Sequence, residues 1–154
     1  PVIVFFQSLI LDMAGNTGTQ SLAVTIRMLS VEEVKAKDLL KLCFKEIRVG
    51  FLNGLILAIL AFAFVFCFLF ITKQSISGGD VYDHLQALKA SGIVALSLLM
   101  AMTICSLIGS AIPIFFMKIK IDPAVASGPF ITTLNDIIAI VLYYGLAYLL
   151  FLAF

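Results

Sequence analysis

The amino-acid sequence predicts an all-α fold: a polytopic transmembrane helix bundle with four spanning helices and one short amphipathic helix at the membrane surface. Of its 154 residues, 62% are hydrophobic and only 12% are charged. The mean hydropathy is +1.17, far from the balance of a soluble domain. Four apolar segments are each long enough to cross a bilayer, since a span needs about 20 apolar residues. Three polar connections separate them, and the first has an amphipathic pattern.

The predicted spans take up most of the chain, at residues 1–29, 47–71, 91–117 and 121–154. The first connection opens with Ser30 and Glu33, which are spaced as a helix capping box. Lysines then alternate with apolar residues up to the second span, which predicts a short helix lying on the membrane surface. The second connection, residues 72–88, contains Ser-Gly-Gly-Asp and is predicted to be an exposed loop with a brief helical turn. In the third, Asp122 and Pro123 are predicted to cap and open the fourth helix.

The basic residues indicate the orientation of the bundle, because cytoplasmic loops are enriched in Lys and Arg. Most of them fall at the first and third connections: Arg27, Lys35, Lys37, Lys41, Lys45, Arg48, Lys118 and Lys120. Only Lys73 and Lys89 fall at the second. We therefore predict that the first and third connections are cytoplasmic, in a multi-pass protein that the lipid bilayer of the cell membrane surrounds.

The composition gives no support to several other classes of protein. The net charge is +1, and no basic patch with interleaved aromatic residues is present, so no nucleic-acid partner is predicted. Cys43, Cys67 and Cys105 are widely spaced, which favours a packing role. The chain begins with Pro1 and lacks an initiator methionine, which indicates a fragment of a longer protein. Its first apolar run lacks the basic residues of a signal peptide.

Two carboxylates lie inside predicted spans, Asp12 in the first and Asp136 in the fourth. An Asp at the bilayer centre costs about 2.5–3.5 kcal/mol on insertion scales, so it must face the bundle interior or a water-filled path. For Asp136 we favour an ion path over a packing role with a hydrogen bond to Thr or Asn. Two interpretations of Asp12 stay open: a functional carboxylate, or one that is neutralised or paired within the bundle.

Helical periodicity groups other polar residues around these carboxylates. One face of the first span carries Asp12, Asn16, Thr19, Ala23 and Arg27, and one face of the fourth carries Pro129, Thr132, Thr133 and Asp136. Asn135 points about 100 degrees away from Asp136. Two polar stripes on two helices predict a shared, hydrated seam. Gly15 and Gly18 lie beside the first stripe, where glycine either exposes backbone carbonyls to an ion or lets a partner helix approach closely.

Two further pairs of small residues predict helix contacts. Gly50 and Gly54 form a GxxxG pattern, and Ser106 and Ser110 have the same spacing. Such pairs are more typical of helix packing in membranes than of ion sites. We therefore assign both pairs to packing.

The ligands available inside the spans point to one class of ion. Carboxylate, amide, hydroxyl and backbone oxygens suit hard cations rather than copper, zinc or iron. Magnesium gives up its waters reluctantly and is usually held by one or two carboxylates with several waters, whereas calcium takes six to eight oxygen ligands. A sparse site around Asp136 therefore fits Mg²⁺ better than calcium, and leaves other divalent cations open.

Two segments carry a resemblance to a known family. Residues 13–20, Met-Ala-Gly-Asn-Thr-Gly-Thr-Gln, and residues 122–136, Asp-Pro-Ala-Val-Ala-Ser-Gly-Pro-Phe-Ile-Thr-Thr-Leu-Asn-Asp, resemble the MgtE magnesium channels. Hydropathy and spacing agree in between, so the resemblance covers residues 1–154. It implies a transmembrane pore domain that contains helices two to five of a five-helix channel. The first helix and the cytoplasmic regulatory domains of the family would then lie outside this chain.

The resemblance also implies a partner and a site. The partner is a second copy of the chain, in a homodimer with one central pore that conducts Mg²⁺ between two copies of Asp136. The first and last helices of this chain would line the pore, with Gly15, Asn16, Gly18, Thr19, Thr132 and Thr133. Asp12 departs from the family pattern, in which we expect a small residue. It is therefore a candidate ligand for a second cation.

Three alternatives to a channel stand beside this prediction. Asp12 could couple cation movement to protons or sodium in a carrier. Two intramembrane aspartates could form the acid-base dyad of an intramembrane aspartyl hydrolase. Neither the motifs of such proteases nor a substrate-binding cluster accompanies them, so no enzyme is predicted. The third alternative is a purely structural membrane subunit.

Overall fold

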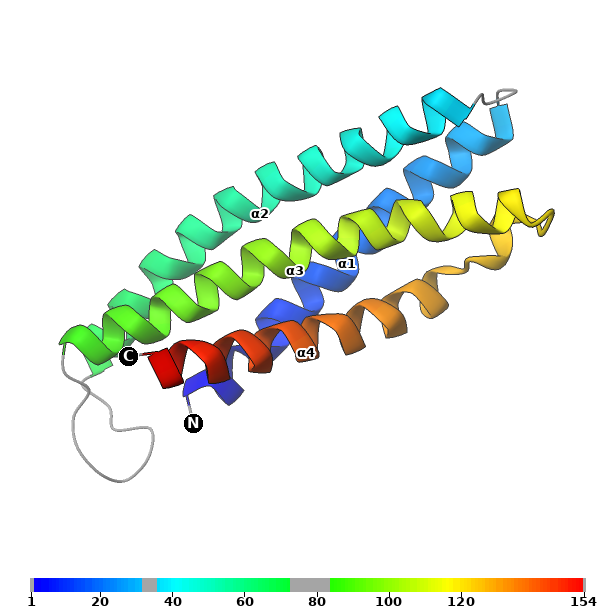
Figure 1. Ribbon diagram of the computed structural model, residues 1–154. Coiled ribbons are helices and arrows are strands. Elements are labelled where there is room, and N and C mark those ends of the chain that lie inside the picture. The colour runs from blue at the N-terminus through cyan, green and yellow to red at the C-terminus, as the bar shows by residue number, and fades with distance from the viewer. Residues whose placement is uncertain (1, 32–35, 73–83, 154) are drawn as a thin grey trace.

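A computed structural model of the chain describes residues 2–31, 36–72 and 84–153, and its regular structure there is entirely helical. The elements are α1 (Val2–Val31), α2 (Ala36–Thr72), α3 (His84–Lys118), the 3-10 turn η1 (Pro123–Val125) and α4 (Gly128–Ala153). The long helices run the length of one elongated bundle, and α1 crosses behind α3 (Figure 1). The predicted all-α class is confirmed.

Three helices in the described part of the chain, α2, α3 and α4, are long and apolar enough to cross a membrane. On α2, large apolar side chains such as Ile59 and Phe64 are 62% and 61% exposed, as a surface in contact with lipid requires. With 30 residues, α1 is also long enough, at roughly 45 Å. Polar residues from Asp12 to Gln20 interrupt its apolar sequence. Three of the four predicted spans are therefore supported, and the predicted count of four is not confirmed.

The predicted separate amphipathic helix is part of α2 instead. Helix α2 runs without a break from Ala36 to Thr72. No Gly or Pro occurs between Ala36 and Val49, so nothing in the sequence ends a helix before the span begins. Ser30 belongs to the last turn of α1, where its hydroxyl donates to the carbonyl of Ile26 at 2.8 Å. Glu33 and the Ser-Gly-Gly-Asp stretch of the predicted second connection lie outside the described residues, whereas residues 84–88 of that connection belong to α3.

The start of the fourth helix also differs from the prediction. Asp122 caps η1, because its carboxylate accepts a hydrogen bond from the backbone N–H of Ala124 at 2.9 Å. Helix α4 begins only at Gly128. Pro129 lies in its first turn, where a missing N–H costs no helical hydrogen bond. The Pro that opens α4 is therefore Pro129 and not Pro123.

Helix α3 is the centre of the bundle. In the most apolar stretch of α3, half of the residues are buried, against 28% in the corresponding stretches of α2 and α4. The end of α1 and the start of α2 lie at the same end of the bundle as the connection from α3 to α4 (Figure 1). This agrees with the prediction that the first and third connections share one side of the membrane.

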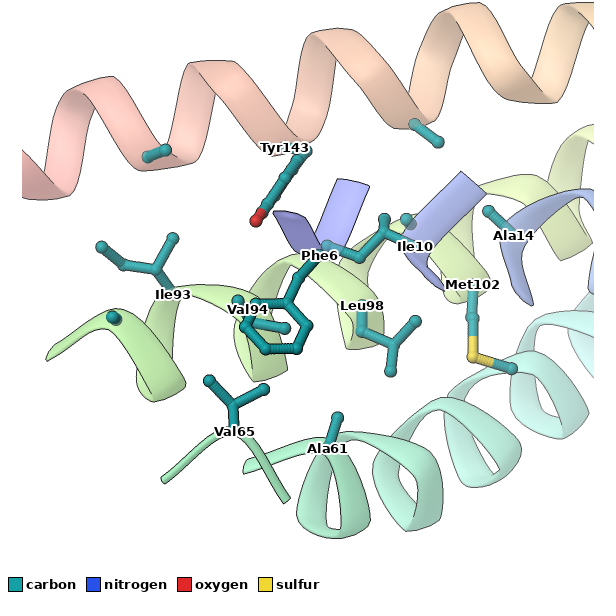
Figure 2. Close-up of a cluster of buried hydrophobic side chains, with 14 of the residues drawn as sticks. Phe6, Ile10, Ala14, Ala61, Val65, Ile93, Val94, Leu98, Met102 and Tyr143 are labelled. Atoms are coloured by element: carbon teal, nitrogen blue, oxygen red, sulfur yellow. The ribbon is translucent and has the colours of Figure 1, made fainter. Parts of the chain in front are cut away.

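A hydrophobic core fills the half of the bundle near the chain termini. Figure 2 shows how side chains from all four helices meet there. They are Phe6, Ile10 and Ala14 of α1, Ala61 and Val65 of α2, Ile93, Val94, Leu98 and Met102 of α3, and Tyr143 of α4. This core packs α1 and α4 side by side against α3, and so brings their polar stripes together.

Small residues join α2 to α3, as predicted. A Cβ atom added to Gly50 would lie 2.5 Å from the Cβ of Ser106, so only glycine allows this approach. Ser106 is fully buried, and its hydroxyl donates to the backbone carbonyl of Glu46 at 2.6 Å. Its oxygen lies 2.8 Å from the hydroxyl of Ser21 in α1, which therefore acts as the donor. The predicted packing role is therefore confirmed for one residue of each pair, Gly50 and Ser106.

Candidate functional site

An open hollow of about 340 Å³ lies between α1 and α4. We call it the α1/α4 hollow, and its lining residues are Ser8, Leu11, Asp12, Gly15 and Asn16 from α1 with Thr132 and Asp136 from α4. The two polar stripes predicted from the sequence therefore meet at one place. Both carboxylates predicted to lie inside spans face the same space, although they are 124 positions apart in the sequence.

Asp136 of α4 faces α1 at Gly15. A Cβ atom at Gly15 would lie 3.5 Å from Oδ1 of Asp136 and 3.5 Å from the methyl carbon of Thr132. The half-buried carboxylate of Asp136 thus lies directly above bare α1 backbone. The carbonyl of Gly15 accepts a hydrogen bond from the Thr19 hydroxyl at 3.0 Å.

Asp12 lies one helical turn before Gly15 and Asn16 and is exposed. Within the described parts of the chain, the one ion pair joins Lys41 to Asp38, at the start of α2. Asp12 therefore has no basic partner there, and the interpretation of Asp12 as a paired packing carboxylate gains no support. Its carboxylate is available to a ligand in the hollow.

Three predicted site residues do not line the hollow. Gly18 is buried where α1 crosses α3 and α4. Thr19 is half-buried, and its hydroxyl donates to helix carbonyls of its own turn. Thr133 is exposed, with its hydroxyl bonded to the carbonyl of Pro129 at 2.9 Å. Of the two uses predicted for the glycines, Gly18 serves close packing, whereas Gly15 lies beneath the carboxylate.

Sequence reasoning missed Ser8 and Leu11. Ser8 is one turn before Asp12, so the periodicity that defined the stripe would have found it. A second hollow, of about 390 Å³, lies on the other flank of α1. It is lined by Met13, Asn16, Thr17, Gln20, Asn53, Ile56, Leu57 and Met102. Asn16 thus borders both hollows, and the amide of Asn53 inside an apolar span was the signal for the second.

The chemistry of the α1/α4 hollow suits a hard cation. Two carboxylates, one amide and two hydroxyl-bearing residues supply only oxygen ligands and the amide nitrogen. The volume is enough for a cation together with several waters. Across the described residues, no three His, Cys, Asp or Glu side chains gather into one group. One chain therefore offers a sparse site, in which water must complete the coordination.

Fold and site together define a class: a polytopic α-helical membrane protein in which carboxylates from two helices face one open hollow. The model of the MgtE family, described as a divalent cation transporter, matches residues 7–146. The chain belongs to this family. It is an integral protein of the cell membrane, and the family consists of transporters, so the prediction that the chain is not an enzyme is confirmed.

Curated relatives agree with the family match. The magnesium transporter MgtE of Bacillus subtilis is 39% identical over 145 residues, which cover 94% of this chain and 29% of that protein. The magnesium transporter MgtE of Enterococcus faecalis is 35% identical over 146 residues, 95% of this chain and 29% of the relative. For the protein of the same name from Thermus thermophilus the identity is 30% over 148 residues. The chain thus spans less than a third of the length of these relatives.

Proposed function

We propose that this chain forms the pore of a magnesium-selective channel, in which hydrated Mg²⁺ passes between intramembrane aspartates of a homodimer. The observation that supports it most is the convergence of Asp12 and Asp136 on the α1/α4 hollow. Carboxylates at this depth are costly unless an ion or water compensates them. The names of the relatives point to the same ion.

Magnesium suits this hollow better than calcium. A calcium ion takes six to eight protein and water oxygens at short distance, whereas magnesium keeps several of its waters and accepts one or two carboxylates. The hollow is open and holds two carboxylates from one chain. An ion that binds through its own waters needs no additional protein ligands at coordination distance. Other divalent cations of similar size are expected to compete with Mg²⁺.

The exposed polar face of α1 supports the proposal of a second copy of the chain. Asp12, Asn16, Ala23 and Arg27 are all exposed in the single chain, on the predicted polar stripe. In lipid, such a face must be covered by protein or by water. A two-fold dimer would place the same face of a second copy against it and bring a second Asp136 to the same path. Cytoplasmic regulatory domains, outside this chain, would complete the protein.

The driving force separates a channel from the alternative, a proton- or sodium-coupled carrier. We expect Mg²⁺ uptake into liposomes that contain the purified protein to follow the membrane potential, which acts on each charge with about 2.3 kcal/mol per 100 mV. Imposed proton and sodium gradients should leave the rate unchanged. A Mg²⁺-sensitive dye inside the liposomes measures it. Uptake that requires either gradient would establish the carrier and remove the channel.

Asp12 should contribute to ion affinity. We expect Asp12→Asn to raise the half-saturating Mg²⁺ concentration about tenfold, since residues that support a metal site typically change affinity by 10–100-fold. The maximal rate should fall less, because Asp136 still lies in the path. Asp12→Glu keeps the charge and should recover part of the affinity. An unchanged half-saturating concentration in Asp12→Asn would show that Asp12 is not a ligand.

A further inference from the structure

The amide of Asn135 occupies the space where Gly18 has no side chain, which we call the Gly18 gap. A Cβ atom added to Gly18 would overlap the amide nitrogen of Asn135, and would lie 2.8 Å from its Cγ and 3.1 Å from the backbone oxygen of Cys105. The gap is therefore bounded by α3 and filled by α4. Gly18 in turn lies against the backbone of α3, because a Cβ atom at Gly109 would overlap the Gly18 carbonyl.

Hydrogen bonding by the side chain does not account for an asparagine at this position. Asn135 is 0% exposed, and among the described residues neither its amide oxygen nor its amide nitrogen has a hydrogen-bond partner. A buried amide without partners costs free energy that an apolar side chain of the same size does not. The shape of the contact, a flat group inserted beside a glycine, is what the amide provides.

The main chain at Asn135 is held as well as its side chain. The thiol of Cys105 in α3 donates to the Asn135 carbonyl at 3.8 Å. Asn135 of α4 thus packs against α1 with its amide and accepts a hydrogen bond from α3 with its carbonyl. The next residue along α4 is Asp136, whose Oδ1 lies above Gly15.

Two neighbouring residues of α4 therefore meet two glycines that are one turn apart on α1. Asn135 enters the gap at Gly18, and Asp136 lies above Gly15, where an added Cβ atom would be 3.5 Å from its Oδ1. Sliding or rotating α4 along α1 would displace both contacts together. The buried contact thereby determines where the carboxylate stands in the α1/α4 hollow.

We propose that Asn135 is a positioning residue for ion binding: its amide, seated in the Gly18 gap, sets the place of Asp136 opposite Asp12. This inference rests on the proposed function, because it assumes that Asp136 binds the transported cation. It assigns a role in transport to a residue that never faces the hollow.

A double-mutant cycle tests it, with Gly18→Ala, Asn135→Ala and the double variant. We expect Asn135→Ala to raise the half-saturating Mg²⁺ concentration for uptake about tenfold, the lower end of what supporting residues around metal ligands contribute. Gly18→Ala should do the same, since its methyl group collides with the amide. In the double variant the methyl takes the place of the amide, so half-saturation should return toward the wild-type value. Gly92→Ala, whose added Cβ meets nothing within 4 Å, is the control.

Thermal unfolding of the same purified variants separates the possible failures. Coupling between positions 18 and 135 in the unfolding temperature, without coupling in half-saturation, would show a contact that does not position Asp136, and would overturn the inference. Absence of coupling in both would overturn it too. Neither result bears on the proposed cation site. That proposal is contradicted only if removal of the Asp136 charge leaves transport unchanged.

Discussion

Replacing Asp136 by asparagine is expected to reduce Mg²⁺ uptake to the level of liposomes without protein. Asparagine has nearly the same size, so the contact above Gly15 persists while the charge that attracts a hydrated divalent cation disappears. In the proposed dimer the substitution removes both copies of the carboxylate at once. Dye-based uptake at a fixed membrane potential measures the effect, and Asp136→Ala should give the same result.

A matched control is available on the surface of the same chain. Asp38 is an exposed aspartate of α2 that pairs with Lys41 at 3.2 Å. Exposed pairs of this kind contribute little to stability, so Asp38→Asn should transport Mg²⁺ at the wild-type rate. Wild-type uptake by Asp136→Asn, in protein that unfolds at the wild-type temperature, would exclude Asp136 from the ion path and with it the proposed pore.

The sequence was sufficient to predict features that follow from periodicity and hydropathy. The helical class and the stripe containing Asp12 and Asn16 depend on spacing along one helix. The structure places these residues in the same hollow as Asp136 and Thr132. Because an intramembrane carboxylate has few tolerable environments, its presence alone indicated that another polar surface faces it.

Features that depend on how helices cross could not be obtained in this way. Gly15 and Gly18 have the same residue type and nearly the same place in the sequence, yet one lies beneath a carboxylate and the other in a packed crossing. Asn135 was predicted only to point away from Asp136, and its seat beside Gly18 depends on the distance between α1 and α4. The interfacial helix was predicted from amphipathicity, which does not tell whether a surface helix continues directly into a span.

The crossing of α1 and α3 leads to the largest expected effect on stability. A Cβ atom at Gly109 would overlap the backbone carbonyl of Gly18 and lie 2.9 Å from its carbonyl carbon. Backbone atoms cannot rotate away as the end of a side chain can, so Gly109→Ala must push the two helices apart. We expect a loss of about 1–3 kcal/mol, as for other overpacked interiors. Thermal unfolding in detergent, followed by the loss of helical circular dichroism, measures it.

Gly92 lies on the same helix, but its replacement by alanine is not expected to reduce stability. An added Cβ there meets nothing within 4 Å. Alanine is the better helix former by about 1 kcal/mol in a helix interior, so Gly92→Ala should leave stability unchanged or raise it slightly. Equal unfolding temperatures for Gly109→Ala and Gly92→Ala would contradict the close crossing at Gly18. They would also remove the support for the Gly18 gap. The backbone of α3 forms one wall of that gap, so the gap depends on the same close approach of α1 to α3.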